Sequence, residues 1–184
     1  WLHERGATLG IDAGRVAIGG DSAGANLSAA TCLLLRDHGM PQVLTGMLLH
    51  YGCYSNELSE QAIDDYGAEG NLLTSNEMTE FWNNYLARPE DALDPLATPL
   101  RARLEGLPPA CLLSAQCDVL AEQSVAFAAR LRAAGVAVVA KEYAGATHSF
   151  LEAVSIAAIA DEALTDGANW LHARLRPQRA EESE

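Results

Sequence analysis

A serine stands at the centre of the pentapeptide Gly20-Asp21-Ser22-Ala23-Gly24. The apolar run Val16-Ala17-Ile18 predicts a strand over 15–19 before it, and a helix is predicted over 22–37 after it. At so tight a strand-to-helix turn, a serine takes a strained backbone conformation that lifts its hydroxyl over the edge of the sheet. The turn brings neighbouring backbone close, so the flanking positions must be small, and the motif supplies two glycines and an alanine. Ser22 is therefore a candidate nucleophile.

A carboxylate and an imidazole follow two later predicted strands. Asp118 comes after the run 110–115, and His148 comes after the run 136–143. Because the carboxyl ends of parallel strands meet at one edge of a sheet, Ser22, Asp118 and His148 are expected to lie together there. His148 would take the serine proton and return it to the leaving group, and Asp118 would hold the imidazole in the required tautomer. The order Ser…Asp…His is that of the α/β-hydrolases.

Each of these residues also has a structural interpretation. The alternatives are a chance match in an ordinary turn for the pentapeptide around Ser22, a loop histidine for His148 and a helix N-cap for Asp118. Other carboxylates compete with Asp118 for the acid position: Glu122, Asp64, Asp65 and Glu142. All three residues are predicted at one edge of the sheet and follow the order Ser…Asp…His along the chain. This combination favours the catalytic interpretation over the structural ones.

The rest of the chain alternates strands and helices. The sequence predicts further strands over 43–50, 110–115 and 136–143, and helices over 121–134 and 155–175. Residues expected on the inner helix faces are Leu27, Ala30, Leu34, Phe127, Leu131, Ala134, Ile156, Ile159, Ala163, Trp170 and Leu175. This alternation predicts an α/β fold with a predominantly parallel sheet flanked by helices.

The segment 51–107 is predicted to be irregular, apart from a helix from Thr74 or Ser75 to about Leu86, with Ser75 as its N-cap. Loops of this length in a compact domain are usually functional, so we expect it to carry part of a cap and the substrate pocket. Candidate pocket residues at strand ends are Asp21, His50, Tyr51 and Phe150. Further candidates are Tyr54, Phe81, Trp82 and Tyr85, with simple helix packing favoured for Phe81 and Tyr85.

Composition restricts the class of partner. The 184 residues carry a net charge of −13, which argues against nucleic acid or an anionic membrane, because both need a basic face. No apolar run approaches the roughly 18 residues of a membrane-spanning helix. The four cysteines form no C-x-x-C pair and no histidine stands at metal-ligand spacing, so no metal or other cofactor is expected. Reduced thiols favour a cytoplasmic protein. Residues 177–184 are expected to form a disordered acidic tail.

Four stretches together resemble the hormone-sensitive-lipase-type esterases, a family of α/β-hydrolases. They are Gly20 to Leu27 at the elbow, Asp118 to Glu122 for the acid motif D-P-L-x-D, His148 to Phe150 for H-G-F or H-A-F, and Asp94 to Leu100 for D-P-x-x-S-P-L. Within the family, residues 48–52 and 160–168 look most like bacterial acetyl esterases. The resemblance covers about residues 1–175. It implies Ser22 as nucleophile, Asp118 as acid and His148 as base, acting on short-chain acyl esters from acetyl to butyryl.

Three residues depart from the family's motifs, and one motif is absent. Val119, Glu122 and Ser149 replace the family's residues beside the triad and put only its fine positioning in doubt. The family's H-G-G-G loop, which supplies most N–H groups of the oxyanion hole, does not occur here, so only the Ala23 N–H can be assigned to that role. We therefore expect residues 1–176 to be the C-terminal part of one catalytic domain, without its early strands and N-terminal cap.

The favoured function is that of a serine carboxylesterase. We expect a small-molecule ester as its partner, no cofactor, and a homodimer as a possible assembly. The same triad could instead serve a deacetylase of acetylated sugars, or a lactone or amide hydrolase, and competition between ester and amide substrates would separate these. A third interpretation is a non-catalytic binding protein on the same scaffold. Binding proteins of this kind lose the triad histidine, whereas His148 is present.

Overall fold

The computed structural model describes residues 1–176, and the predicted tail at 177–184 lies outside the described residues. Its centre is a parallel sheet of four strands in the order β1-β2-β3-β4. The strands are β1 (Ile18–Asp21), β2 (Met47–His50), β3 (Ala110–Cys117) and β4 (Val138–Thr147). The predicted parallel α/β architecture is confirmed. β2 begins later than predicted, because residues Pro41–Val43 form a one-turn 3₁₀ helix, η2.

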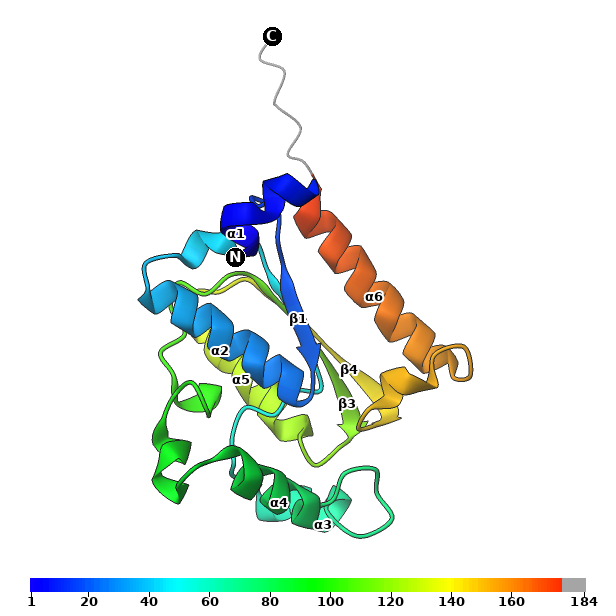
Figure 1. Cartoon of the computed structure of the whole chain (residues 1–184). Coiled ribbons are helices and arrows are strands. Elements are labelled where there is room, and N and C mark those ends of the chain that lie inside the picture. Colours follow the sequence, from blue (N-terminus) through cyan, green and yellow to red (C-terminus); the bar gives the residue numbers. More distant parts are fainter. Residues whose placement is uncertain (177–184) are drawn as a thin grey trace.

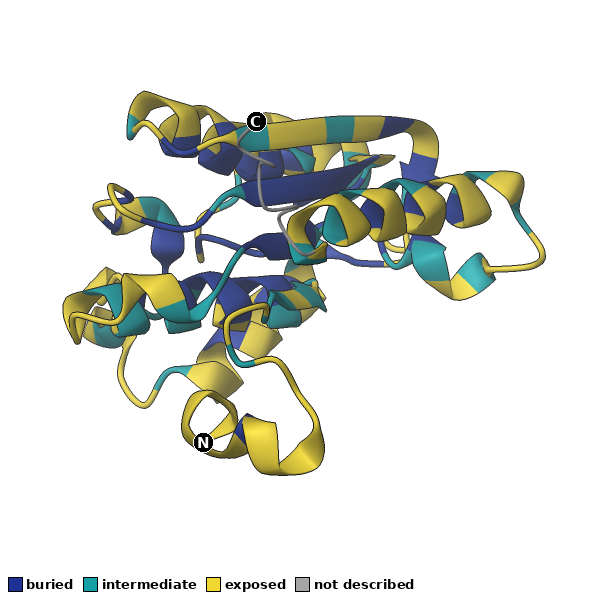
Figure 2. Cartoon of the chain, turned by 90° about the horizontal axis from the view of Figure 1, so that it is seen from above, coloured by how far each residue is buried: buried dark blue, intermediate teal, exposed yellow. Residues whose placement is uncertain are grey.

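Helices cover the two faces of the sheet. α2 (Ala23–Asp37) and α5 (Ala121–Ala133) pack on one face, and α6 (Ala158–Leu175) packs on the other (Figure 1). The central strands are buried, whereas the outer sides of the helices are exposed (Figure 2). At the N-terminus, α1 (Leu2–Arg5) and the 3₁₀ helix η1 (Gly6–Leu9) end at Gly10, whose φ of 74° lies in the left-handed region that favours glycine.

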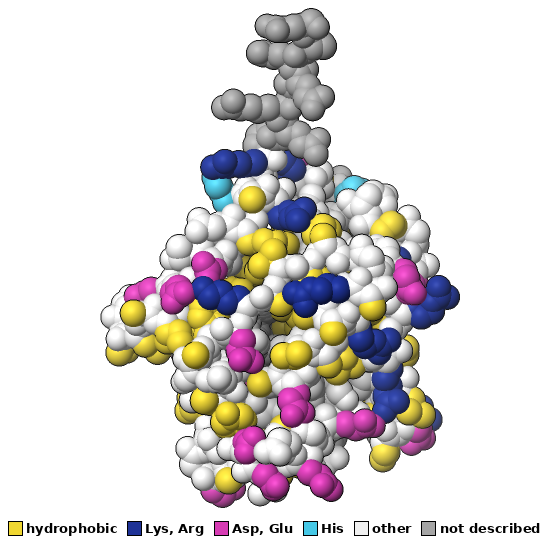
Figure 3. Space-filling view, turned by 180° about the vertical axis from the view of Figure 1, so that it is seen from behind, with side chains coloured by type: hydrophobic (Ala, Val, Ile, Leu, Met, Phe, Trp, Pro, Cys, Tyr) yellow, Lys and Arg dark blue, Asp and Glu magenta, His cyan; other side chains and the backbone are white. Residues whose placement is uncertain are grey.

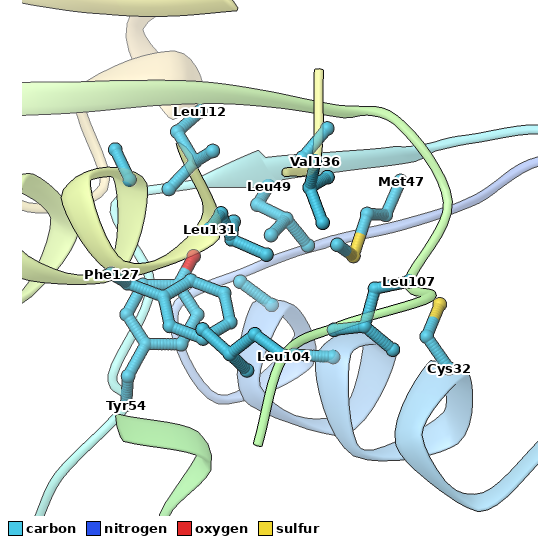
Figure 4. Close-up of a cluster of buried hydrophobic side chains, with 14 of the residues drawn as sticks. Cys32, Met47, Leu49, Tyr54, Leu104, Leu107, Leu112, Phe127, Leu131 and Val136 are labelled. Carbon is cyan, nitrogen blue, oxygen red and sulfur yellow. The ribbon is translucent and has the colours of Figure 1, made fainter. Parts of the chain in front are cut away.

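The larger core cluster lies between the sheet and the layer of α2 and α5 (Figure 4). Leu49 and Leu112 contribute from the strands, and Phe127 and Leu131 contribute from α5. Tyr54 joins this cluster, because it is fully buried and its ring stacks on Phe127 with the centroids 4.1 Å apart. Tyr54 is therefore a core residue, and the prediction that it lines the substrate pocket is wrong.

The inner face of α2 differs from the predicted one. Leu27 and Leu34 are 53% and 46% exposed, whereas Ala25, Ala29 and Leu33 are buried. In the first turns of α2 small side chains face the sheet, because the helix continues directly from the tight turn at the end of β1 and starts close to the sheet, and Leu33 is the large residue buried further along. The leucine spacing therefore indicated the wrong side of this helix.

The C-terminal helix begins later than predicted, at Ala158. Ile156 lies in the connection before it and is 88% exposed, so its predicted place on the inner face is wrong. Ala163 is buried as predicted, and Trp170 is half-buried with its ring against Gly46. None of the helices within residues 1–176 is long and apolar enough to cross a membrane.

Residues 51–107 run beyond the carboxyl ends of the strands, where α3 (Glu60–Tyr66) and α4 (Ser75–Tyr85) lie (Figure 1). α4 matches the predicted helix, but its N-cap is Thr74, whose hydroxyl accepts a hydrogen bond from the Glu77 N–H. α3 is not predicted by the pattern, because it buries only Ala62. The shorter helices of the chain are 3₁₀ turns: η3 (Pro89–Leu93), η4 (Pro99–Arg101) and η5 (Phe150–Ala153).

A buried glutamine on α5 holds the backbone of residues 54–57. The Gln123 amide oxygen accepts hydrogen bonds from the N–H groups of Tyr54 (2.7 Å) and Ser55 (2.9 Å). Its amide nitrogen donates to the carbonyl oxygens of Ser55 and Glu57, both at 3.0 Å. The side chain thus uses its full bonding capacity to attach the start of the irregular segment to the core.

Replacing Gln123 with alanine is expected to lower the free energy of unfolding by about 3–5 kcal/mol, because it leaves several buried backbone groups without partners. Urea unfolding followed by circular dichroism measures the change. The matched control is Gln61→Ala, since the Gln61 amide bonds only to the exposed Asp65 carboxylate. That variant should stay within about 0.5 kcal/mol of the unchanged chain. Equal losses in the two variants would contradict the role given to Gln123.

Charge is unevenly distributed over the surface. On the face seen in Figure 3, acidic side chains predominate toward the end where α3 and α4 lie. No lysine or arginine occurs between Arg36 and Arg88. α3 and α4 carry the carboxylates of Glu60, Asp64, Asp65, Glu77 and Glu80. The elements beyond the carboxyl edge of the sheet therefore present a negative surface.

Candidate active site

Ser22 occupies the turn between β1 and α2. Its backbone has φ 53° and ψ −117°, a conformation that residues other than glycine rarely adopt. The Ser22 N–H donates to the carbonyl oxygen of His50 at 2.9 Å, which ties the turn to the end of β2. The serine therefore lies at the carboxyl edge of the sheet and at the start of a helix, where free N–H groups and the positive end of the helix dipole favour negative charge.

Only one glycine of the motif is needed for space. A Cβ built on Gly20 would lie 2.4 Å from the carbonyl carbon of Gly24 and 2.5 Å from its oxygen. A Cβ on Gly24 would meet nothing within 4 Å beyond its own helix. The expectation that both positions must lack a side chain is therefore right for Gly20 and wrong for Gly24, because only the Cβ direction at Gly20 points into the turn.

The Gly20→Ala substitution is expected to lower the free energy of unfolding by about 2–4 kcal/mol, because the added methyl group overlaps backbone that cannot move without displacing Ser22. Gly24→Ala is the matched control and should cost less than about 1 kcal/mol. Thermal unfolding of the two variants measures both changes. A Gly20→Ala variant as stable as the control would refute the steric argument.

Asp118 and His148 lie beside Ser22 at the same edge. Asp118 follows β3 and His148 follows β4, and both side chains are buried. The Nδ1 of His148 lies 2.7 Å from Oδ2 of Asp118, and its Nε2 lies 3.0 Å from the Ser22 hydroxyl oxygen. The other Asp118 oxygen accepts the N–H of Leu120 at 2.9 Å, which fixes the carboxylate. The three residues thus form a continuous chain of hydrogen bonds.

Tyr51 packs against the imidazole. Its ring meets the His148 ring edge-on, with the centroids 5.1 Å apart, and Phe150 packs on it with the centroids 5.8 Å apart. Tyr51 is buried and has φ 34°, so its backbone is strained. Burial, together with the carboxylates of Asp21, Glu152 and Asp118, raises the pKa of the Tyr51 hydroxyl. The phenol therefore remains neutral beside the histidine.

An apolar cavity of about 470 Å³ opens beside the serine. Residues of α2, α4 and the start of the irregular segment line it: Ser22, Ala23, Asn26, Leu27, Cys53, Met78, Phe81, Trp82, Asn84 and Tyr85. Phe81 and Tyr85 are 57% and 53% exposed, so the prediction that they serve only in packing is wrong. Burial raises the pKa of the Cys53 thiol to about 12, so this wall of the cavity is uncharged.

The four residues predicted at strand ends do not line this cavity. Asp21 is exposed at the end of β1, and His50 is half-buried at the end of β2, where burial lowers its pKa. Tyr51 and Phe150 belong to the core cluster on the α6 face of the sheet. Phe150 also lines a separate cavity of about 500 Å³ between Leu72 and the start of α6.

The oxyanion donor assigned from the sequence, the Ala23 N–H, lies at the first position of α2. First-turn N–H groups have no partner within their own helix, so this N–H is free to bind an anion beside Ser22. Of the carboxylates in the described part of the chain, Asp118 is the one that bonds to His148, rather than Glu122, Asp64, Asp65 or Glu142. Residues 1–176 contain no group of three or more His, Cys, Asp or Glu side chains that could hold a metal ion.

Known proteins are similar to this chain in sequence and in fold. A family model described as the alpha/beta hydrolase fold matches residues 1–152. An ethyl acetate hydrolase of Pseudomonas putida is 36% identical over 168 residues, which are 89% of this chain and 52% of that protein. A carboxylic ester hydrolase of Mycobacterium tuberculosis is 38% identical over 156 residues, 82% of this chain and 42% of its own length.

The fold has a similar counterpart among solved structures. EstE1, a thermophilic carboxylesterase cloned from a metagenomic library, matches with a TM-score of 0.91 and 34% identity, over 96% of this chain and 60% of that one. The chain thus spans about half the length of the curated relatives it matches. The chain belongs to the α/β-hydrolase fold family, as its hormone-sensitive-lipase-type motifs predicted.

Proposed function

We propose that this chain carries the catalytic centre of a serine carboxylesterase. Ser22 is the nucleophile, His148 the general base and acid, and Asp118 the group that orients the histidine. The observation that carries the proposal is the continuous hydrogen-bond chain from the Ser22 hydroxyl through both ring nitrogens of His148 to the Asp118 carboxylate. It supports the tautomer with the proton on Nδ1, which leaves Nε2 free to accept the serine proton.

Acylation begins when the Ser22 oxygen attacks the carbonyl carbon of the ester and its proton passes to Nε2 of His148. The resulting oxyanion lies at the start of α2, where the Ala23 N–H donates to it. The tetrahedral intermediate collapses as the bond to the alcohol oxygen breaks, and His148 protonates that oxygen. Water then attacks the acyl-enzyme with His148 again as base, which releases the acid and restores Ser22.

The names of the relatives support an ester as substrate. One is an ethyl acetate hydrolase, and another is an acetyl esterase of Salmonella that is 32% identical over 169 residues. Among linear acyl groups, we extend this to the present chain as a preference for short ones, acetyl to butyryl, over longer chains. A series of 4-nitrophenyl esters should therefore show a higher kcat/KM for the acetyl than for the decanoyl ester. Faster turnover of the decanoyl ester would refute the preference.

Hydrolysis of 4-nitrophenyl acetate is the test of the activity itself. Turnover should be lost when a fluorophosphonate has modified one site per chain, because the reagent phosphonylates an activated serine. Peptide mapping should then find the label on Ser22 and not on the buried Ser28 of the same helix. Turnover that persists after complete labelling of Ser22 would rule out the proposed nucleophile.

A further inference from the structure

The apolar cavity touches one side of the proposed centre only. It is lined by Ser22 and Ala23, but neither His148 nor Asp118 contributes to it. If the proposed function holds, this asymmetry decides where the acyl half and the alcohol half of an ester lie. His148 must protonate the leaving oxygen, so the alcohol half has to lie within reach of Nε2. The acyl half then lies away from the histidine, on the side of the cavity.

The wall of the cavity formed by α4 is aromatic. Phe81 and Tyr85 stand one turn apart on the helix and are both more than half exposed. Trp82 lies deeper, 9% exposed, and its ring meets that of Tyr85 with the centroids 5.8 Å apart. Aromatic rings bury a large area with few rotatable bonds and prefer edge-to-face or offset contacts with other rings. Such a wall fits a planar apolar group better than a flexible alkyl chain.

Charge around the cavity selects against anions. Its lining in the described chain contains no charged side chain, and the Cys53 thiol there is neutral. The neighbouring helices α3 and α4 carry carboxylates and no lysine or arginine. A carboxylate on the acyl group would lose part of its hydration, would find no cationic side chain in the lining and would meet a negative field. The occupant is therefore neutral.

From these observations we infer that the cavity is the acyl subsite and that it accepts an aromatic acyl group of the arylalkanoyl class, such as phenylacetyl. Phe81 and Tyr85 are its specificity-determining residues, and Trp82 and Met78 form its floor. A volume of about 470 Å³ exceeds what an acetyl group fills and lies within the usual size range of ligand pockets. A compact ring on the acyl side is compatible with poor turnover of long linear chains.

Esters of one alcohol test whether the acyl half of the substrate gains from a ring. With 4-nitrophenol as the common alcohol, the phenylacetyl ester should exceed the acetyl ester about tenfold in kcat/KM, and a hemisuccinyl ester should be poorer than both. The phenylacetyl-to-acetyl ratio should fall to about one in the double variant Phe81→Leu, Tyr85→Leu. The control Trp1→Leu removes an exposed aromatic ring that does not line the cavity and should keep the ratio. Equal turnover of the acetyl and phenylacetyl esters, or a ratio that the double variant keeps, would overturn the inference.

Binding provides a second readout that needs no turnover. The three tryptophans give three indole N–H signals in a nitrogen–proton spectrum of the labelled chain, and only Trp82 lines the cavity. Phenylacetamide should shift the Trp82 signal saturably, acetamide should not, and the double variant should lose the effect. Absence of a Trp82 shift with phenylacetamide would overturn the inference. Failure of all Ser22-dependent turnover with this shift present would instead refute the proposed function alone.

Discussion

Replacing Ser22 with alanine is expected to lower kcat for 4-nitrophenyl acetate by roughly 10⁵- to 10⁶-fold. The loss should be this large because the acyl-enzyme can no longer form, so the histidine and the carboxylate have no nucleophile to activate. KM should change little, since the cavity and the start of α2 remain. Stopped-flow and long-time absorbance assays together cover the range of rates needed.

Ser28→Ala is the matched control for this substitution. Ser28 lies on the same helix, and its hydroxyl donates to the Gly24 carbonyl oxygen at 2.8 Å. The hydrogen bonds of the His148 ring go to Asp118 and Ser22 and not to Ser28, so loss of the Ser28 hydroxyl should leave kcat close to that of the unchanged chain. A similar loss in both variants would mean that Ser22→Ala acts through the fold of α2 and not through the nucleophile.

Replacing Asp118 with asparagine should lower kcat by about 10⁴-fold while keeping the shape of the site. The asparagine amide would donate toward Nδ1 and so favour the histidine tautomer with its proton on Nε2. That proton would face the Ser22 hydroxyl, and the imidazole could not act as base. The asparagine amide oxygen can take the place of the carboxylate oxygen that accepts the Leu120 N–H, so the local turn should be preserved.

Asp94→Asn provides the comparison for Asp118→Asn. The Asp94 carboxylate accepts the N–H of Leu96, two residues on, in the same kind of turn that Asp118 makes with Leu120. It does not contact the histidine, so its activity should be unchanged. Full activity in the Asp118→Asn variant would exclude this carboxylate from the mechanism, and the acid would have to be sought among the competing carboxylates of Glu122, Asp64, Asp65 and Glu142.

The positions of the three site residues could be predicted because they follow from strand geometry alone. Ser22, Asp118 and His148 each come after an apolar run, and parallel strands that share an orientation bring such positions to one edge. The prediction did not depend on which face of each helix is buried or on how the loops pack. It was thus insensitive to the later starts of β1 and β2.

The lining of the apolar cavity beside Ser22 could not be predicted in the same way. On α4, residues Met78, Phe81, Trp82 and Tyr85 recur at helical spacing, a pattern that indicates one inner face. The structure divides them: Met78 and Trp82 are buried, whereas Phe81 and Tyr85 are exposed at the cavity. Which half of such a stripe meets the core depends on where the helix lies relative to the sheet, and the spacing does not contain that information.

The inner face of α2 was mispredicted for a related reason. Its buried residues include alanines, which give a weak periodic signal, while Leu27 points to the cavity. The first turns of a helix that starts at a tight turn beside the sheet pack through small side chains, here Ala25 and Ala29, so Leu27 faces outward, and the large Leu33 is buried only further along the helix. The small residues of the motif at 20–24 were themselves a sign of this close approach.

Detection of the acyl-enzyme is the most direct test of the central claim. The chain is mixed with 4-nitrophenyl acetate, quenched in acid during the first turnovers, digested and analysed by mass spectrometry. The account predicts an added acetyl group on the peptide that contains Ser22, formed as fast as nitrophenol is released and absent from the Ser22→Ala variant. An acetyl group on another residue at the rate of turnover, or turnover with no acetylated Ser22 at any time, would contradict it.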